Sequence, residues 1–168
     1  MNYYIIGLPL CGKKYISNLI HNITKFNIIN INSIIESKYN DILLNIYNKY
    51  KYNTYLNIEY DVSNKTIIQS TNKIIILPNT ILDNIYFIDK LKLTGHIIYV
   101  KEEYNSFFFR FINNNYLLLS QYNNLENIYN EYDILYNNIT NNIINNNIIN
   151  KPKQKDIEDF LNNLDKIT

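Results

Sequence analysis

The sequence contains very little of several residue types. Its 168 residues include one cysteine, three glycines and three prolines, and it has no tryptophan. A single cysteine excludes an internal disulfide framework and is typical of a reducing compartment, so we expect a cytoplasmic protein. No apolar run approaches the ~20 residues that a membrane-spanning helix needs, and we therefore expect no membrane association.

The charge is close to balance, with a formal net charge of +1. Such a chain has no strong field that would attract nucleic acid or an acidic membrane, so we expect no nucleic-acid partner. Apolar residues make up 46% of the sequence, which together with the small charge imbalance excludes a disordered protein. The length predicts a single domain over residues 1–168.

Isoleucine, asparagine and tyrosine are abundant, with 33, 33 and 17 residues. Their codons are rich in A and T, whereas those of glycine, alanine, proline and arginine are rich in G and C. The chain has no alanine and a single arginine, Arg110. The composition therefore indicates a gene from an AT-biased genome, in which drift can remove an arginine or glycine without selection for its replacement.

Short apolar runs alternate with longer amphipathic segments. Runs typical of strands lie at 3–6, 26–31, 73–77, 96–100 and 143–149. Apolar residues recur at helical spacing in 12–24, 34–60, 81–93, 104–112, 125–139 and after Pro152. Because the strands are dense in apolar residues and separated by helices, they predict an α/β fold of three layers, with about five parallel strands flanked by helices.

The first predicted strand–helix junction contains a phosphate-loop motif. Residues 7–14 spell G-L-P-L-C-G-K-K and fit G-x-x-x-x-G-K. Glycines at Gly7 and Gly12 let backbone N–H groups curl around a phosphate, and Lys13 reaches the β- and γ-phosphates. The motif's next position normally carries the Ser or Thr hydroxyl that binds Mg²⁺, but here it is Lys14, which cannot be a metal ligand.

The loop cysteine and the two histidines have structural interpretations. Cys11 lies near a helix N-terminus, which can lower a thiol pKa, but we interpret it as the occupant of a variable loop position. Neither His21 nor His96 has a carboxylate or a second histidine at metal-ligand spacing. We therefore predict no metal cluster and no nucleophilic triad.

From the phosphate loop onward, the chain resembles shikimate kinase over nearly its full length. The resemblance implies a small single-domain P-loop kinase, expected as a monomer, that transfers the γ-phosphate of ATP to the 3-hydroxyl of shikimate for chorismate and aromatic amino acid biosynthesis. ATP and Mg²⁺ are the cofactors that it implies. On the same basis, the cofactor-binding positions are Gly7, Leu10, Cys11, Gly12, Lys13, Lys14, Tyr15, Arg110 and Asn115, with Lys14 at the metal position.

The catalytic and substrate-binding positions depart from the family pattern. The strand that ends in Asp-Thr-Asp in the family carries Asn30 and Asn32 here, which with Lys13 are the implied catalytic positions. Amides keep size and hydrogen bonding but lose the negative charge and any role as a base. The implied substrate positions are Asn32, Leu56, Pro78 and Tyr132.

Two of these departures remove family arginines. The substrate arginines fall on Leu56 and Tyr132, which cannot form forked bonds to a carboxylate, and the glycine triplet falls on residues 77–79. Arg110 matches an arginine before the lid, whose own arginine falls on Asn115 or one residue later. Each lost charge-assisted bond costs on the order of 1.5–3 kcal/mol, so the predicted activity is weak or lost.

Three hypotheses therefore stay open: a shikimate kinase with a degraded site, a non-catalytic P-loop module that binds a nucleotide or a partner, and another small-molecule or nucleotide kinase of the same fold.

Two compensations for the missing Mg²⁺ ligand and substrate arginines are conceivable. The Lys14 ammonium could take the Mg²⁺ position, against the alternative of an AT-driven replacement. Lys51 or Lys73 could replace a substrate arginine.

Overall fold

The computed structural model describes residues 1–114 and 124–164. They form a five-stranded parallel sheet of order β2-β3-β1-β4-β5, which confirms the predicted fold class. The strands are β1 (Asn2–Ile6), β2 (Asn27–Asn30), β3 (Lys73–Ile76), β4 (Gly95–Lys101) and β5 (Ile143–Asn145). The helices are α1 (Lys13–Thr24), α2 (Ile31–Tyr39), α3 (Leu43–Ile68), η1 (Thr80–Asp83), α4 (Ile85–Thr94), α5 (Tyr104–Asn114), α6 (Leu125–Ile139) and α7 (Gln154–Leu164).

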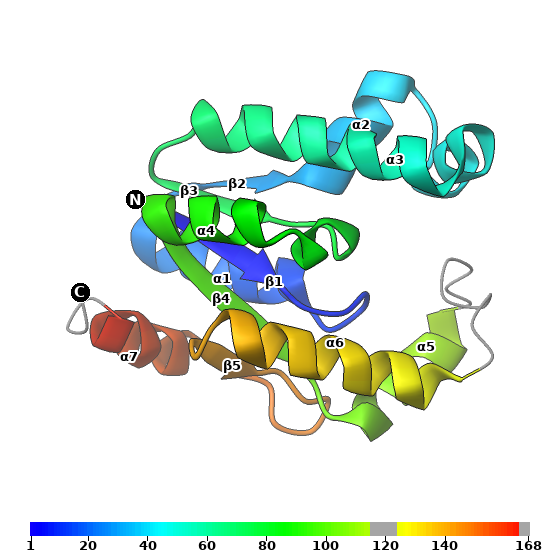
Figure 1. The fold of residues 1–168 in the computed structure, drawn as a ribbon. Coiled ribbons are helices and arrows are strands. Elements are labelled where there is room, and N and C mark those ends of the chain that lie inside the picture. The colour runs from blue at the N-terminus through cyan, green and yellow to red at the C-terminus, as the bar shows by residue number, and fades with distance from the viewer. Residues whose placement is uncertain (115–123, 165–168) are drawn as a thin grey trace.

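Both faces of the sheet are covered, as Figure 1 shows. All five residues of β1 are buried. Tyr4 and Ile6 belong to a core that includes residues of α2 to α6, whereas Tyr3 and Ile5 pack with residues of α1 and α7. Successive strand side chains point to opposite faces, so an uninterrupted apolar strand needs a helical layer on each side.

The structure corrects the predicted helical segment at 34–60. It consists of two helices, because Asn40 adopts the left-handed conformation (φ 52°) that ends α2. A second departure lies inside α3, where Lys51 has φ 64° and ψ 169° and kinks the helix. Periodicity alone showed neither break, since asparagine and lysine are ordinary residues of exposed helix faces.

Asparagine begins three of the described helices. The side chain of Asn30 accepts a hydrogen bond from the backbone of α2, Asn84 from that of α4, and Asn124 from that of α6. Short amide side chains satisfy the unpaired N–H groups of a first helical turn. The cap at Asn84 also divides the predicted helix at 81–93 into η1 and α4.

The parallel register places one end of every strand at the same edge of the sheet. β1 lies between β3 and β4, with Ile5 opposite Ile76 and Ile98. The chain leaves β1 toward β2 on one side and later returns to β4 on the other. Ligands of open parallel sheets bind at such a switch point, beyond the carboxyl ends of the strands. None of the described helices is long and apolar enough to cross a membrane.

Candidate phosphate-binding and acceptor site

The loop between β1 and α1 has the conformation that its glycines permit. Gly7 has φ 144° and Gly12 has φ 89°. A Cβ at Gly7 would lie 2.6 Å from the Val100 carbonyl oxygen, and one at Gly12 would lie 2.1 Å from Nδ2 of Asn146. Both positions therefore require glycine. Leu10 also has a positive φ, 66°.

Two side chains from distant parts of the sequence fasten this loop. Asn146 Nδ2 donates to the carbonyl oxygen of Cys11 at 2.7 Å, and Nη1 of Arg110 donates to that of Leu10 at 2.9 Å. Within the loop, the Cys11 N–H donates to the Leu8 carbonyl oxygen at 3.4 Å. The N-terminus of α1, which begins directly after Gly12, offers N–H groups to an anion.

Lys13, the first residue of α1, lies across the loop. Its ammonium donates to the carbonyl oxygen of Gly7, to that of Leu8 at 3.0 Å and to Oδ1 of Asn79 at 3.4 Å. Burial lowers the pKa of this ammonium, and the Cys11 thiol beside it acts in the opposite direction. An anion near the loop would favour the charged form and compete with these carbonyl oxygens for it.

Cys11 is buried, with 1% of its surface exposed. Burial raises the pKa of its thiol, against the smaller effect of Lys13. A buried neutral thiol is a poor nucleophile. The interpretation of Cys11 as a space-filling loop residue is thus consistent with its packing between the sheet and α1.

A cavity of about 390 Å³ extends from this loop toward the end of β2 and the helices α2, α3 and α6. We call the part at the loop the phosphate end and the part at the helices the acceptor end. The phosphate end is lined by Leu8, Pro9, Leu10, Gly12, Lys13 and Lys14, and the acceptor end by Asn30, Asn32, Leu43, Tyr47, Tyr52, Tyr55, Glu59 and Tyr132. Residues 76–80 line the cavity between the two ends, since Asn79 bonds Lys13 and Thr80 bonds Glu59.

The residues present do not form a protein-held Mg²⁺ site. Lys14 lines the phosphate end where a ligating hydroxyl is expected, and Asn30 and Asn32 offer amides instead of carboxylates. In the described chain, no three His, Cys, Asp or Glu residues gather as a metal site would require. The Lys14 ammonium makes no hydrogen bond or ion pair with another described residue, so it is available to neutralise phosphate charge.

The end of β2 supplies two amides to the cavity. Asn30 Oδ1 accepts the backbone N–H of Asn32 at 3.0 Å and begins α2. Oδ1 of Asn32 is buried and has no hydrogen-bond partner. A buried unpaired acceptor costs free energy until a donor reaches it. Asn32 therefore lines the cavity with an amide whose buried oxygen has no partner among the described residues.

Glu59 is the acidic residue of the cavity lining. It is 3% exposed, and Thr80 donates a short hydrogen bond to its Oε2. Burial raises the pKa of this carboxyl to about 7, and hydrogen bonds from Thr80 and Tyr55 oppose the increase. The carboxyl is therefore partly protonated near neutral pH and carries a full charge only at higher pH.

Other predicted residues lie at varied distances from the cavity. Pro78 and Tyr132 line it, whereas Leu56 packs against the hydrophobic core of α2 to α6 and is not part of the lining. Tyr15 donates its hydroxyl to the Pro152 carbonyl oxygen at 2.8 Å, which ties α1 to the segment before α7. Asn115 lies outside the described residues.

Neither lysine suggested as a substitute for a substrate arginine lines the cavity. Lys73 begins β3 and pairs with Asn27, at the opposite end of the strands from the phosphate loop. Parallel pairing fixes that separation, so the expectation for Lys73 is wrong. Lys51 is exposed at the kink of α3, and it is the next residue, Tyr52, that lines the acceptor end.

Arg110 supports the loop from α5. Besides bonding the Leu10 carbonyl, its Nε lies 3.0 Å from Oε1 of Glu102, whose side chain is 1% exposed. Burial raises the pKa of Glu102 to about 7, and the charges of Arg110 and Lys151 oppose the increase. The arginine is thus engaged by a buried acid and a loop carbonyl, and it is not part of the cavity lining.

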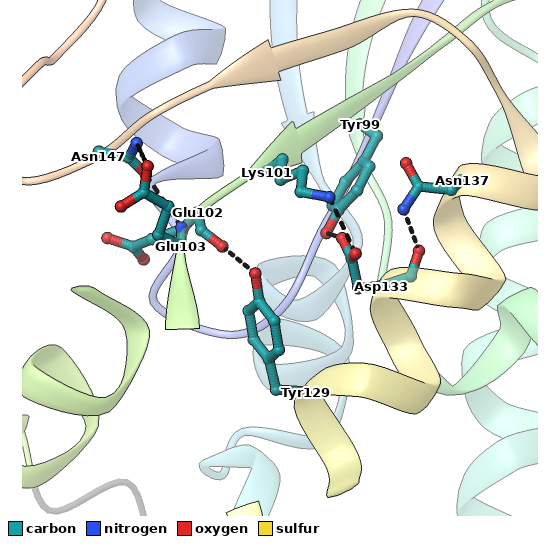
Figure 2. A network of polar contacts seen from close by, with 8 residues as sticks. All are labelled: Tyr99, Lys101, Glu102, Glu103, Tyr129, Asp133, Asn137 and Asn147. Carbon is teal, nitrogen blue, oxygen red and sulfur yellow. Dashed lines mark hydrogen bonds and ion pairs between the residues drawn. The ribbon is translucent and has the colours of Figure 1, made fainter. Parts of the chain in front are cut away.

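A polar network fixes α6 against the end of β4 (Figure 2). Asp133 accepts the Tyr99 hydroxyl at 2.6 Å and the Lys101 ammonium at 2.9 Å. One helical turn earlier, Tyr129 donates its hydroxyl to the Glu102 carbonyl oxygen at 2.6 Å. With the helix fixed at two points one turn apart, the residue beside Asp133, Tyr132, is held at the cavity wall.

Sequence reasoning missed several site residues. Tyr52, Tyr55 and Glu59 line the cavity from α3. The motif match over residues 55–59 included Tyr55 and Glu59 but assigned the substrate position to Leu56, and no motif included Tyr52. Asn146 lies in an asparagine-rich tract inside the segment 143–149 that was predicted as the fifth strand. The observed strand ends at Asn145, and in a parallel sheet that end lies near the phosphate loop.

The fold and the loop define the class of protein: an α/β P-loop kinase fold. No model of a protein family matches the sequence. A search of curated proteins also gives no match. Among solved structures, by contrast, 70 chains match.

Several of the matching solved structures are shikimate kinases. The enzyme of Acinetobacter baumannii, solved in complex with shikimate, superposes with a TM-score of 0.82 at 17% identity, covering 99% of this chain and 94% of that one. The enzyme of Bacteroides thetaiotaomicron gives 0.78 at 12% identity, with 99% and 97% covered. A deoxyadenosine kinase of M. mycoides gives 0.53 at 16% identity, with both chains fully covered. The chain therefore has the fold of the shikimate kinases.

Proposed function

We propose that the protein is a phosphotransferase that transfers the γ-phosphate of ATP to a hydroxyl group of a small molecule. The observation that carries this proposal is the shared cavity: Lys13 and Lys14 line one end, and the amides at the end of β2 line the other. A phosphate held by the loop would thus face a molecule held at the acceptor end. Phosphoryl transfer depends mainly on such positioning and on charge neutralisation.

Each group of residues has its own role in this proposal. Backbone N–H groups of the loop and the α1 N-terminus hold the phosphates. Lys13 turns from the Gly7 and Leu8 carbonyls toward the phosphate oxygens. Lys14 adds a second positive charge. Asn32 orients the acceptor through a hydrogen bond to a hydroxyl. Since an amide is no base, the acceptor proton must leave to solvent or to the transferred phosphoryl group.

Shikimate is the acceptor that the fold and the motif spacing favour, in the pathway leading to chorismate. A nucleoside is a second candidate acceptor, since a deoxyadenosine kinase shares the fold and since tyrosines line the acceptor end. A protein that binds ATP without transferring its phosphate is the non-catalytic alternative.

The test is ADP release from ATP and Mg²⁺ with each acceptor, compared between the wild-type protein and Lys13→Met. Losing the ammonium should remove acceptor-dependent turnover by at least ~100-fold, because the charge that develops on the transferred group is no longer neutralised. A circular dichroism melt controls for folding. Turnover that survives in Lys13→Met, or ATP binding without turnover on any acceptor, would contradict the proposal.

A further inference from the structure

The charges of the cavity are distributed unevenly. Within the described part of the chain, its charged lining residues are Lys13, Lys14 and Glu59. Both lysines belong to the phosphate end, and the acceptor end contributes only the acid. The segment 115–123, which the structure does not describe, contains no lysine or arginine in its sequence.

We infer that the acceptor end binds an uncharged hydroxyl compound with an apolar face and discriminates against carboxylates. This inference rests on the proposed phosphotransferase function and narrows its acceptor class. It argues against shikimate itself, the acceptor that the fold and the motif spacing favour, because shikimate carries a carboxylate.

The charged residue at the acceptor end is Glu59, whereas Lys13 bonds the Gly7 and Leu8 carbonyls and Asn79. A carboxylate entering the acceptor end would lose water without gaining a cation there, and the negative charge of Glu59 would add repulsion. The arginine of the chain cannot compensate from its place, because Arg110 bonds Glu102 and the Leu10 carbonyl outside the lining.

The hydrogen-bonding groups of the acceptor end also favour a hydroxyl. Oδ1 of Asn32 is buried without a partner among the described residues, and a ligand hydroxyl can donate to it once the amide turns toward the cavity, whereas a carboxylate only accepts. Oε2 of Glu59 already accepts from the Thr80 hydroxyl.

An apolar wall lines the acceptor end. Tyr47 and Tyr55 pack edge to face with ring centroids 5.5 Å apart, and Leu43 lines the same end. Tyr132 closes it from α6, against Tyr136 at 5.6 Å between centroids. Rings and aliphatic groups bind an apolar face by burial and contact, without any charge on the ligand.

The test uses one matched pair of ligands, shikimate and its methyl ester, which share the ring and the hydroxyls and differ in the carboxylate charge. Isothermal titration at pH 7.5, with and without a non-hydrolysable ATP analogue, measures binding independently of turnover. We expect the ester to bind roughly tenfold more tightly than the acid. Shikimate binding as tightly as its ester, or no binding of either compound in the millimolar range, overturns the inference.

Two variants sharpen the result. Tyr132→Lys introduces a cation at the acceptor end and should reverse the preference toward shikimate, whereas Tyr132→Met, similar in length but uncharged, should not. Glu59→Gln removes the negative charge and should reduce the preference for the ester over the acid severalfold. An unchanged preference in both charge variants contradicts the inference. If the ester binds as expected but ADP is never released, the acceptor class stands and the proposed function fails.

Discussion

The two ends of the cavity differ in how closely they match the family pattern that the sequence resembles. The phosphate end consists mainly of backbone, and it needs few particular residues: Gly7 and Gly12 for their conformations and Lys13 for its charge. The acceptor end consists of side chains, and there asparagine and tyrosine stand where the resemblance implies aspartate and arginine. A site made by the backbone depends on a few positions, whereas a site made by side chains changes its ligand with each substitution.

Gly12→Ala is expected to have the largest effect at the phosphate end. Alanine would carry a Cβ 2.1 Å from Asn146 Nδ2 and would have to adopt φ 89°. We expect ATP binding to weaken at least ~10-fold and the free energy of unfolding to fall by about 1–3 kcal/mol. Calorimetric titration and urea unfolding measure the two effects.

A double variant separates collision from backbone strain. Gly12→Ala with Asn146→Ala removes the atom that the new Cβ would strike but retains the positive φ. Because Asn146→Ala by itself removes the hydrogen bond to the Cys11 carbonyl, the double variant is compared with Asn146→Ala. We expect Gly12→Ala to cost less stability in that background than in the wild type, but not to become neutral. A neutral Gly12→Ala in that background would show that the loop conformation itself does not require glycine, and a Gly12→Ala protein with wild-type ATP affinity would contradict the assignment of the phosphate end.

Glu59→Gln tests the protonation of the acidic residue at the acceptor end through the free energy of unfolding. Burial raises the pKa of Glu59 from 4.5 to about 7, so between these pH values the folded protein retains a proton that the unfolded chain has released. Raising the pH through this window therefore weakens the folded state, by about 3 kcal/mol at most. The glutamine variant should lose less stability between pH 5 and pH 8 (a window set by the two pKa values) than the wild type.

Urea unfolding at several pH values measures this difference. Glu102 has a pKa raised to about 7 as well, so part of the pH dependence should persist in Glu59→Gln. Glu102→Gln is no matched control, since it breaks the ion pair with Arg110. Identical pH profiles for wild type and Glu59→Gln would show that the Glu59 carboxyl is not held in its neutral form.

Lys14→Ser is expected to have the smallest effect and concerns the metal. If the Lys14 ammonium neutralises phosphate charge, wild-type ATP binding should persist in EDTA. The serine variant, which restores a ligating hydroxyl, should bind ATP severalfold more weakly in EDTA and recover with Mg²⁺. Lys14→Gln serves as the control without charge or hydroxyl. Strict Mg²⁺ dependence of wild-type binding would refute the role of Lys14.

Much of the scaffold could be predicted because its signals are local. The strand of Tyr3 to Ile6 is apolar on both faces, and the glycine spacing after it is specific enough to place a phosphate loop. The acceptor end could not be predicted in the same way. The kink at Lys51 sets which residues of α3 face the cavity, and nothing in the sequence identifies a lysine that adopts φ 64°.

The role of Asn146 could not be predicted from the local sequence either. The segment 143–149 was predicted as a strand, but nothing in it distinguishes Asn146 from its neighbouring asparagines. Parallel pairing of Val100 with Ile144 carries Asn146 to the loop, where it bonds the Cys11 carbonyl. Contacts between residues 135 positions apart depend on the assembled sheet. Its importance follows from tertiary structure and has no counterpart in the local sequence.

The account is tested most directly by one steady-state comparison: ADP release from ATP by the wild-type protein with shikimate and with its methyl ester. A phosphate end that binds ATP and an acceptor end that disfavours carboxylates together predict acceptor-dependent ADP release, with kcat/KM roughly tenfold higher for the ester. Release that is equal with both acceptors or greater with shikimate would show that the acceptor end still recognises a carboxylate, which would contradict the account.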